Sequence, residues 1–396
     1  MSGHQRTVSC RILLTLVCIG ASATTTYNRS IRSVRGNVHF AIEAAGRRAI
    51  RAAEWRIALR QAGTEPIGLI SAAAFCEDEV FLLDSRQAIV HRIHLPTGRQ
   101  TGHIGSSTER ADAPRRPRAM ALDCAGHALY LIDRTGVFVF SLTSGRVERH
   151  FLQPKNFVYT GGNAVLDSAH AMLFVPGLWT SGSWSDWLQR DLDHAFVGDR
   201  LGYSLSLRDG ATKPLFVPLE RGCWAYSSSC LEVVFDEVRS DGPEKWVVAQ
   251  RVSTQVGVFD SQYRLQRMLD VRSPGFLENG QRVGHSDSQA DQTRWRENNS
   301  IIHNVYMFGN EVVTIHTKRA TKDWIAGQPL DFEVYMNIHS LDGTALVSDV
   351  RLPDLPVVRD ERNLYVIDYG PGGRRIGIDH VTLIRYPIIA DRALFH

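Results

Sequence analysis

Residues 119–146 constrain the fold most strongly, because the preceding stretch repeats their pattern. From position 120 they read MALDCAGHALYLIDRTGVFVFSLTSGR, three short apolar runs separated by turns. Val80–Asp84 precedes the matching run Leu129–Asp133 by 49 residues, and Gly98–Arg99 precedes Gly145–Arg146 by 47 residues. A repeat of about 40–50 residues built from four short strands is typical of a β-propeller blade.

The spacing predicts an all-β chain that folds as a six-bladed β-propeller of four-stranded antiparallel blades. The blades are expected within residues 66–104, 119–152, 161–218, 231–271, 301–352 and 357–387. In blade six, Ile376–Ile378 and Thr382–Pro387 are the predicted third and fourth strands. Trp55–Leu59 is a spare strand, and we expect it to complete the last blade and close the ring, because this removes exposed sheet edges. A β-sandwich or a pair of β domains is the competing fold.

Three of the repeats end their second strand on Asp, in the sequences FLLD, LYLID and LYVID. This pattern resembles the NHL-repeat-like six-bladed propellers of many exported bacterial proteins, over residues 55–390. Blades three to five depart from it, with Pro176, Gln250 and His316 at the Asp position. The resemblance implies a fold and not a function, because such propellers include binding and scaffold proteins as well as lyases, lactonases and other hydrolases.

The N-terminus has the organisation of a secretory signal peptide over residues 1–23. Arg6 and Arg11 precede the apolar run Ile12–Ser22, and Ala21–Ser22–Ala23 offers a cleavage site. An uncleaved anchor or a disordered start are the alternatives. Residues 24–54 read as a flexible lead-in, and residues 55–390 as a single propeller domain. We therefore expect a secreted or periplasmic protein with no transmembrane segment after the leader.

The charge balance argues against a nucleic-acid partner. The net charge of the chain is +3, and removal of Arg6 and Arg11 with the leader leaves 3 − 2 = +1. A chain so close to neutral lacks the basic surface that binds phosphate backbones.

Four cysteines remain after the leader, namely Cys76, Cys124, Cys223 and Cys230. An even number in an exported protein favours disulfides. Cys76 and Cys124 occupy nearly the same turn of consecutive blades, and Cys223 and Cys230 are seven residues apart. We predict the pairs 76–124 and 223–230, with four free buried thiols as the alternative.

Three long insertions, at residues 176–200, 272–300 and 317–331, are predicted on one face of the ring. In a propeller the loop after the second strand and the link between blades both emerge on that face. Long loops on a rigid scaffold commonly build binding sites. We therefore expect a small molecule, a glycan or a protein to bind there, although the insertions could also be decoration without a function.

Candidate ligand-binding residues follow from this placement. They are Trp179, Trp184 and Trp187 in the first insertion, and the ring of arginines Arg86, Arg118, Arg134 and Arg251. Indole rings stack on sugars or pack against partners. They could equally pack the insertion onto the propeller. The carboxylates of Asp84 and Asp133 are interpreted as structural, accepting backbone N–H groups in the turn that follows each strand.

A second hypothesis is a metal-dependent hydrolase or lyase, which the resemblance to lactonase-like propellers suggests. Asn163 and Asp368 would hold a divalent cation at the mouth of the central channel, and their oxygen ligands suit Ca²⁺. His303 and His316 are the candidate catalytic residues, because a histidine near the metal could act as a general base. The sequence leaves open whether the protein is an enzyme; the favoured hypothesis is a non-catalytic, exported binding protein.

Overall fold

The structure is a computed structural model in which the chain divides into two units, Ala53–Ala390 and Met1–Ala52 with Asp391–His396. It describes residues 55–59, 67–105, 114–159, 163–180, 198–219, 233–237, 244–277, 291, 298–319, 332–360, 362–369 and 381–388. The predicted signal peptide and lead-in lie outside these residues. Within them, no helix is long and apolar enough to cross a membrane.

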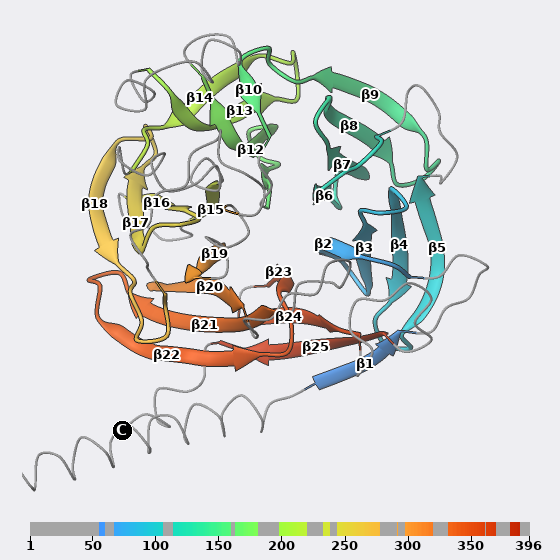
Figure 1. The fold of residues 1–396 in the computed structure, drawn as a ribbon. Coiled ribbons are helices and arrows are strands. Elements are labelled where there is room, and N and C mark those ends of the chain that lie inside the picture. Colours follow the sequence, from blue (N-terminus) through green and yellow to red (C-terminus); the bar gives the residue numbers. More distant parts are fainter. Residues whose placement is uncertain are drawn as a thin grey trace, which may run out of the picture. The chain divides into compact units, whose positions relative to one another are not determined.

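The unit Ala53–Ala390 is a ring of six antiparallel sheets, which confirms the predicted propeller (Figure 1). Blade one contains β2 (Ile70–Cys76), β3 (Glu79–Asp84), β4 (Ile89–His94) and β5 (Arg99–Gly105). Blade two contains β6 (Ala119–Asp123), β7 (Ala128–Ile132), β8 (Gly136–Ser141) and β9 (Val147–Leu152). Blade four contains β15 (Val233–Glu237), β16 (Glu244–Gln250), β17 (Gln255–Asp260) and β18 (Leu265–Asp270), and blade five β19 (Ile301–Phe308), β20 (Glu311–Arg319), β21 (Phe332–Ser340) and β22 (Ala345–Leu352).

Blade three departs from the pattern of a single inner strand. Two short pieces, β10 (Phe157–Val158) and β11 (Val165–Asp167), both pair with β12 (Met172–Trp179). The remaining strands are β13 (Arg200–Ser206) and β14 (Thr212–Phe216). The predicted insertion was expected to begin at Pro176, but β12 continues through that residue, with an irregularity in pairing between Val175 and Leu178.

The core of the ring lies between neighbouring blades, and this explains the uninterrupted apolar runs. In β3, Val80 and Leu82 pack in a cluster with blade six, whereas Phe81 and Leu83 pack in a cluster with blade two. Successive side chains of a strand point to opposite faces. A strand in the middle of a blade is therefore apolar at every position.

The ring closes in blade six through pairing of the two ends of the described chain. This blade has β23 (Pro356–Arg359), β24 (Asn363–Asp368), β25 (Val381–Pro387) and, outermost, β1 (Trp55–Leu59). The predicted closure by Trp55–Leu59 is confirmed. The prediction that residues 382–387 form the fourth strand is wrong, because β25 is third and β1 supplies the fourth; Ile376–Ile378 lies outside the described residues.

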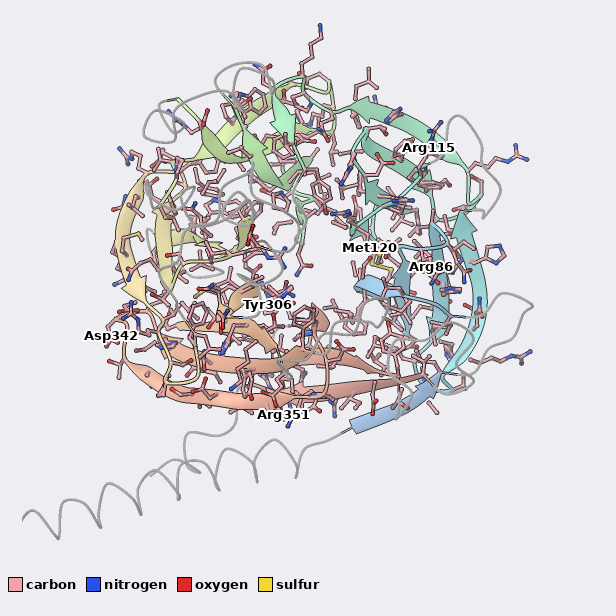
Figure 2. All side chains as sticks on the ribbon, in the orientation of Figure 1. Arg86, Arg115, Met120, Tyr306, Asp342 and Arg351 are labelled. Carbon is pink, nitrogen blue, oxygen red and sulfur yellow. A yellow bond between two sulfur atoms is a disulfide. The ribbon has the colours of Figure 1, made fainter. Side chains whose placement is uncertain are left out.

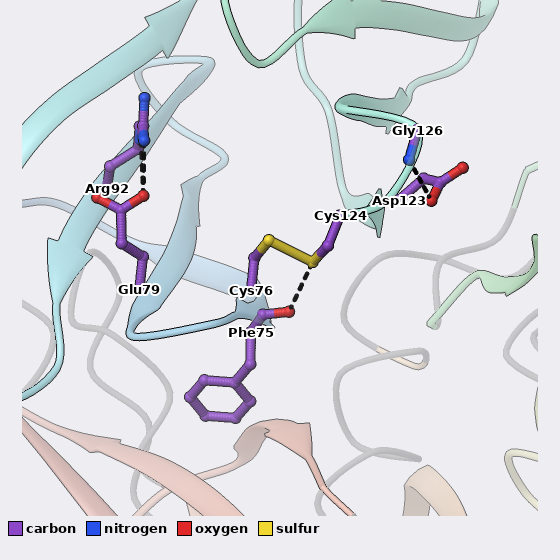
Figure 3. Close-up of a disulfide and its surroundings, with 7 residues drawn as sticks. All are labelled: Phe75, Cys76, Glu79, Arg92, Asp123, Cys124 and Gly126. Carbon is purple, nitrogen blue, oxygen red and sulfur yellow. Dashed lines mark hydrogen bonds and ion pairs between the residues drawn. A yellow bond between two sulfur atoms is a disulfide. The ribbon is translucent and has the colours of Figure 1, made fainter.

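A disulfide joins Cys76 at the end of β2 to Cys124 after β6, with the two Cα atoms 5.6 Å apart (Figure 3). It links blades one and two at the matching turns from which the pair was predicted. The predicted Cys223–Cys230 pair lies outside the described residues. Beside the disulfide on blade one, Arg92 donates to Glu79 at 2.6 Å across β3 and β4.

Removing β1 should weaken the ring. We compare a chain that starts at residue 54 with one that starts at residue 60, which lacks only β1 and its neighbours. The shorter chain loses about 1 kcal/mol for each missing ladder hydrogen bond and about 2 kcal/mol for the burial of Leu59. Urea unfolding measures the difference, and equal midpoints for the two chains would show that β1 contributes nothing to closure.

The interblade disulfide should stabilise the fold. Cys76 and Cys124 are 48 residues apart, and a cross-link over a loop of this length contributes about 2–4 kcal/mol. A variant carrying Cys76→Ala and Cys124→Ala should unfold at lower denaturant concentration than the oxidised wild type. A reductant should shift the wild type by more than it shifts the variant, which keeps Cys223 and Cys230; equal shifts in the two proteins would contradict the prediction.

Candidate functional site

A cavity of about 200 Å³ opens where the inner strands begin, around the central channel. The first residues of the inner strands of blades one, five and six line it, together with Arg118, Asn163 and Arg251 from blades two, three and four. All six blades therefore contribute to one pocket. Figure 2 shows how the inner strands, with Tyr306 on β19 and Met120 on β6, surround the centre of the ring.

The pocket lies on the face of the ring that the sequence indicates as functional. Inner strands begin on this face, and second strands end on it, because consecutive strands in each blade are antiparallel. The loops that follow β12, β16, β20 and β24 therefore leave from the pocket face, as do the links between blades. The structure places the pocket at the base of the predicted insertions, most of whose residues lie outside the described ranges.

Three of the inner strands contain an extra residue at the pocket. In β2 the pairing with β3 skips Ser71, in β19 the pairing with β20 skips His303, and in β23 the pairing with β24 skips Val357. Ser71, His303 and Val357 all line the cavity. A β-bulge leaves its extra residue unpaired and re-aims the side chain. The bulges thus turn one side chain from each of these blades toward the channel mouth.

The side chain of Ser71 has a polar atom at the pocket that forms no hydrogen bond within the described part of the protein. Its Oγ atom is shielded from solvent and has no hydrogen-bond partner among the described residues. A shielded hydroxyl without a partner carries a desolvation cost of about 1–3 kcal/mol. A bound molecule or an ordered water in the pocket would remove that cost.

Arg251 and His303 form a connected pair on the pocket wall. Arg251 Nη2 lies 2.6 Å from His303 Nδ1, and Arg251 Nε donates to the carbonyl oxygen of Ile302 at 3.0 Å. A guanidinium has donors only, so His303 Nδ1 must accept. His303 Nε2 then carries the proton and donates to Thr317 Oγ1 at 2.9 Å. Both ring nitrogens of His303 are engaged, an arrangement that suits a positioning residue better than a general base.

Arg118 adds a second guanidinium to the lining from the residue just before β6. Its charge and that of Arg251 both act on the buried hydroxyl of Tyr159. Burial raises the pKa of Tyr159, and the two arginines oppose that shift. Two positively charged side chains from different blades therefore line the same cavity.

The polar amides of the lining come from blades three and five. Asn163 Nδ2 donates to the Tyr306 hydroxyl at 3.4 Å, and Asn304 Nδ2 donates to the same oxygen and to the carbonyl of Pro356. Burial raises the pKa of Tyr306 to about 12, which keeps the phenol protonated at neutral pH. Asn163 and Asn304 are thereby held in place at the pocket wall.

A buried ion pair lies at the ends of the inner strands that are farther from the pocket. It joins blades four and six across the inner strand of blade five. Arg359 Nε donates to Asp236 Oδ2 at 2.6 Å and Arg359 Nη2 donates to Asp236 Oδ1 at 2.9 Å. The backbone N–H of Met307, between them, also donates to this carboxylate. Asp236 is on β15 and Arg359 on β23, so the pair connects blades four and six and neutralises its own charge away from the pocket.

The repeated carboxylates at the ends of the second strands have structural contacts. Asp84 accepts the backbone N–H groups of Gly68, Arg86 and Gln87, and Asp133 accepts that of Arg115, which lies in the link before the blade. Gln250, at the same position in blade four, accepts the N–H of Leu219 at 2.7 Å. These side chains hold the links between blades. The predicted ligand residues Arg86 and Arg134 follow such anchors, are exposed, and do not line the cavity.

His316, a candidate catalytic residue, is not part of the cavity lining and packs between blades four and five, against Phe276. It is fully buried, its Nδ1 accepts from Asn337 Nδ2 at 3.1 Å, and its Nε2 lies 3.8 Å from Asp349 Oδ1. Asp349 accepts from the hydroxyl of Ser273 and the N–H of Gly275, at the start of the link that follows blade four. His316 therefore belongs to a buried network that anchors this link.

Of the two proposed metal ligands, Asn163 lines the pocket, and Asp368 ends β24 on the same face without being part of the lining. In the part of the chain that the structure describes, no group of three or more His, Cys, Asp or Glu side chains could hold a metal ion. Trp179 is half-buried at the end of β12, and the centroid of its ring lies 6.3 Å from that of Tyr203. Trp184 and Trp187 lie outside the described residues.

Reasoning from the sequence places Arg118, Asn163 and His303 at the starts of inner strands, and the structure brings all three to one cavity together with Arg251. The prediction from the sequence does not include Ser71 and Asn304, which also line the cavity. Counting residues along each inner strand would have pointed to Asn304, but the bulge that turns Ser71 inward leaves no pattern in the sequence.

Comparison with known proteins gives a fold and no family. No family model matches the chain, and no curated protein matches it in sequence. A member of the DUF4221 family from Bacteroides vulgatus has a similar structure, with a TM-score of 0.58 and 10% identity over 83% of this chain and 95% of that one.

More remote likenesses include a calcium-binding protein, regucalcin, from Agrobacterium tumefaciens, with a TM-score of 0.44 and 10% identity over 84% of this chain and 97% of that one. The β-propeller domain of Swd1 from Myceliophteria thermophila has a TM-score of 0.41 and 9% identity over 81% of this chain and 98% of that one. The chain is similar to these proteins in being a β-propeller.

The buried His316 should make stability fall in mild acid. Burial lowers its pKa to about 4 from 6.5, with Asp349 opposing the shift and Lys318 adding to it. Because the unfolded chain takes up the proton first, this contribution is complete above pH 6.5 and is lost as the pH falls toward 4. The free energy of unfolding should drop by about 2 kcal/mol more between pH 7 and 5 in the wild type than in His316→Gln. Equal pH slopes would contradict a neutral, buried His316.

Proposed function

We propose that this chain is an exported, non-catalytic binding protein whose ligand enters the pocket at the mouth of the propeller channel. The observation that carries the proposal is the set of three β-bulges that turn Ser71, His303 and Val357 into one cavity. Bulges disrupt the ladder of their sheet and are enriched next to functional sites. Three of them on separate blades that all serve one cavity support a binding role for it.

The Cys76–Cys124 disulfide supports the exported location. Disulfides persist in oxidising compartments such as the periplasm and the extracellular space. The signal-like segment at residues 1–23 points the same way. We therefore place the protein in the periplasm or outside the cell.

Two features favour binding over catalysis. The nitrogens of His303 are both occupied by Arg251 and Thr317, and His316 is buried in a network outside the cavity lining. A general base must reach the proton that it abstracts. The alternative function, a hydrolase or lyase that uses a cation such as Ca²⁺ in the channel, draws its support from the fold-level resemblance alone.

Filling the pocket tests the proposal. Ser71→Phe adds a ring to the cavity wall, and Ser144→Phe makes the same change in the exposed turn between β8 and β9. In a thermal-shift panel of neutral, anionic and cationic small molecules, compounds that stabilise the wild type should also stabilise Ser144→Phe and should fail to stabilise Ser71→Phe. Equal stabilisation of both variants would place the ligand elsewhere.

Metal analysis of the same purified protein separates the two functions. The binding hypothesis expects no stoichiometric ion and a melting temperature unchanged by EDTA. An ion that is bound at one equivalent, and that is lost in Asn163→Ala, would overturn the non-catalytic proposal in favour of the metal-dependent alternative.

A further inference from the structure

We propose that the pocket selects a small oxyanion, bound by Arg118 and Arg251, and that His303 positions Arg251 for this contact. The inference rests on the proposed function, because it names the chemical class of ligand for that site. It concerns charge and geometry at the pocket wall, which neither the fold nor the repeat pattern determines.

The charges of the residues that line the cavity favour an anionic ligand. Arg118 and Arg251 are its charged side chains among the described residues, and no Asp or Glu is among them. Ser71 and Asn163 add a hydroxyl and an amide, groups that donate hydrogen bonds to an anion without adding negative charge. Asn304 is neutral as well, and its amide N–H groups already donate to Tyr306 and to the carbonyl of Pro356. A cation in this cavity would be repelled by two guanidinium groups. Only neutral oxygen atoms would replace the water molecules that the cation loses on binding.

The acidic residues nearest the channel have other roles. Asp84 and Asp133 accept backbone N–H groups of the interblade links, and Asp236 forms the bidentate pair with Arg359 at the far ends of the inner strands. Asp354, just before β23, accepts the N–H of Leu355 at 2.6 Å and is not part of the lining. These carboxylates hold structure around the cavity without contributing to its wall.

Both arginines line the same cavity. Their charges also both act on Tyr159, which is buried between blades two and three. Arginine presents several donors in a planar fork that matches the oxygens of a carboxylate or a phosphate. Two such groups from blades two and four, on opposite sides of blade three, could contact a single anion between them.

His303 fixes the direction of one of these forks. The contacts from Arg251 Nη2 to His303 Nδ1 and from Arg251 Nε to the carbonyl of Ile302 hold two edges of the guanidinium plane. The bulge in β19 brings His303 to this position, and Thr317 Oγ1 fixes its tautomer. A fork held in place loses less side-chain freedom when a ligand binds, so His303 should raise affinity without touching the anion.

The size of the cavity limits the ligand. Its volume of about 200 Å³ is below the range of about 300–1,000 Å³ in which drug-sized molecules bind. The expected occupant is a small carboxylate or phosphate, or the anionic end of a larger molecule whose remainder extends toward the face that carries the insertions.

The test uses succinate and inorganic phosphate as anionic probes, succinamide as the neutral analogue and 1,4-diaminobutane as the cationic analogue. Isothermal titration of the full chain at low ionic strength should detect at least one of the two anions and neither of the analogues. Arg118→Gln should weaken that anion at least tenfold, because a hydrogen bond to a charged group contributes about 1.5–3 kcal/mol. Arg116→Gln is the matched control, since it removes the same charge from the same link outside the cavity.

The positioning role of His303 is tested by the affinity for the anion in two variants. His303→Gln keeps an acceptor for Arg251 and a donor for Thr317, whereas His303→Ala removes both. We expect the Gln variant to bind the anion within a fewfold of the wild type and the Ala variant to bind it about tenfold more weakly, as for one lost positioning contact. Equal losses in the two variants, or none in either, would overturn the positioning role.

The outcomes separate this inference from the proposed function. If succinamide or 1,4-diaminobutane binds and Ser71→Phe abolishes that binding, the pocket binds ligands but the anion selectivity is wrong. If Arg116→Gln loses as much affinity as Arg118→Gln, the anion binds through general surface charge and the site is wrong. If neither anion binds the wild type, the selectivity for a small oxyanion is overturned, while the panel with Ser71→Phe still decides whether the pocket binds anything.

Discussion

The pairing of β1 with β25 ties the two ends of the propeller together, because it places the strand that precedes blade one in the sheet of blade six. The pairing register runs from Trp55 opposite Arg385 to Leu59 opposite Val381. It joins residues more than 300 positions apart, so of the described strand pairs it carries the largest entropic cost of loop closure. Once it forms, each blade has a neighbour on both sides, and the apolar clusters between blades become continuous around the ring.

The architecture could be predicted because it depends on a repeated local pattern. Strands in the middle of a blade are buried on both faces, so runs such as VFLLD and LYLID are apolar throughout, and the turns between them recur at fixed positions. Blade six was harder to assign, since its fourth strand comes from the other end of the chain. Blade three was harder because β10 and β11 share the edge of β12.

The pocket could be predicted only in part, for a related reason. Arg118, Asn163 and His303 stand at the starts of inner strands, where the repeat identifies the channel mouth. The bulges that bring in Ser71 and Val357 are single-residue shifts in pairing, which no propensity or spacing reveals. His316 stands at the position that corresponds to Asp84, but β20 continues past it to Arg319 and its side chain belongs to a buried network outside the cavity lining.

The closure of blade six has a consequence for how this protein can be handled. β1 enters the ring at Trp55, beside Arg385 near the end of β25, and both positions lie on the face opposite the pocket. The chain therefore enters β1 and leaves β25 on the face opposite the pocket. A fusion partner or an immobilising tether joined directly to the start of β1 or to the end of β25 would emerge from that face and leave the mouth of the channel open to the solution.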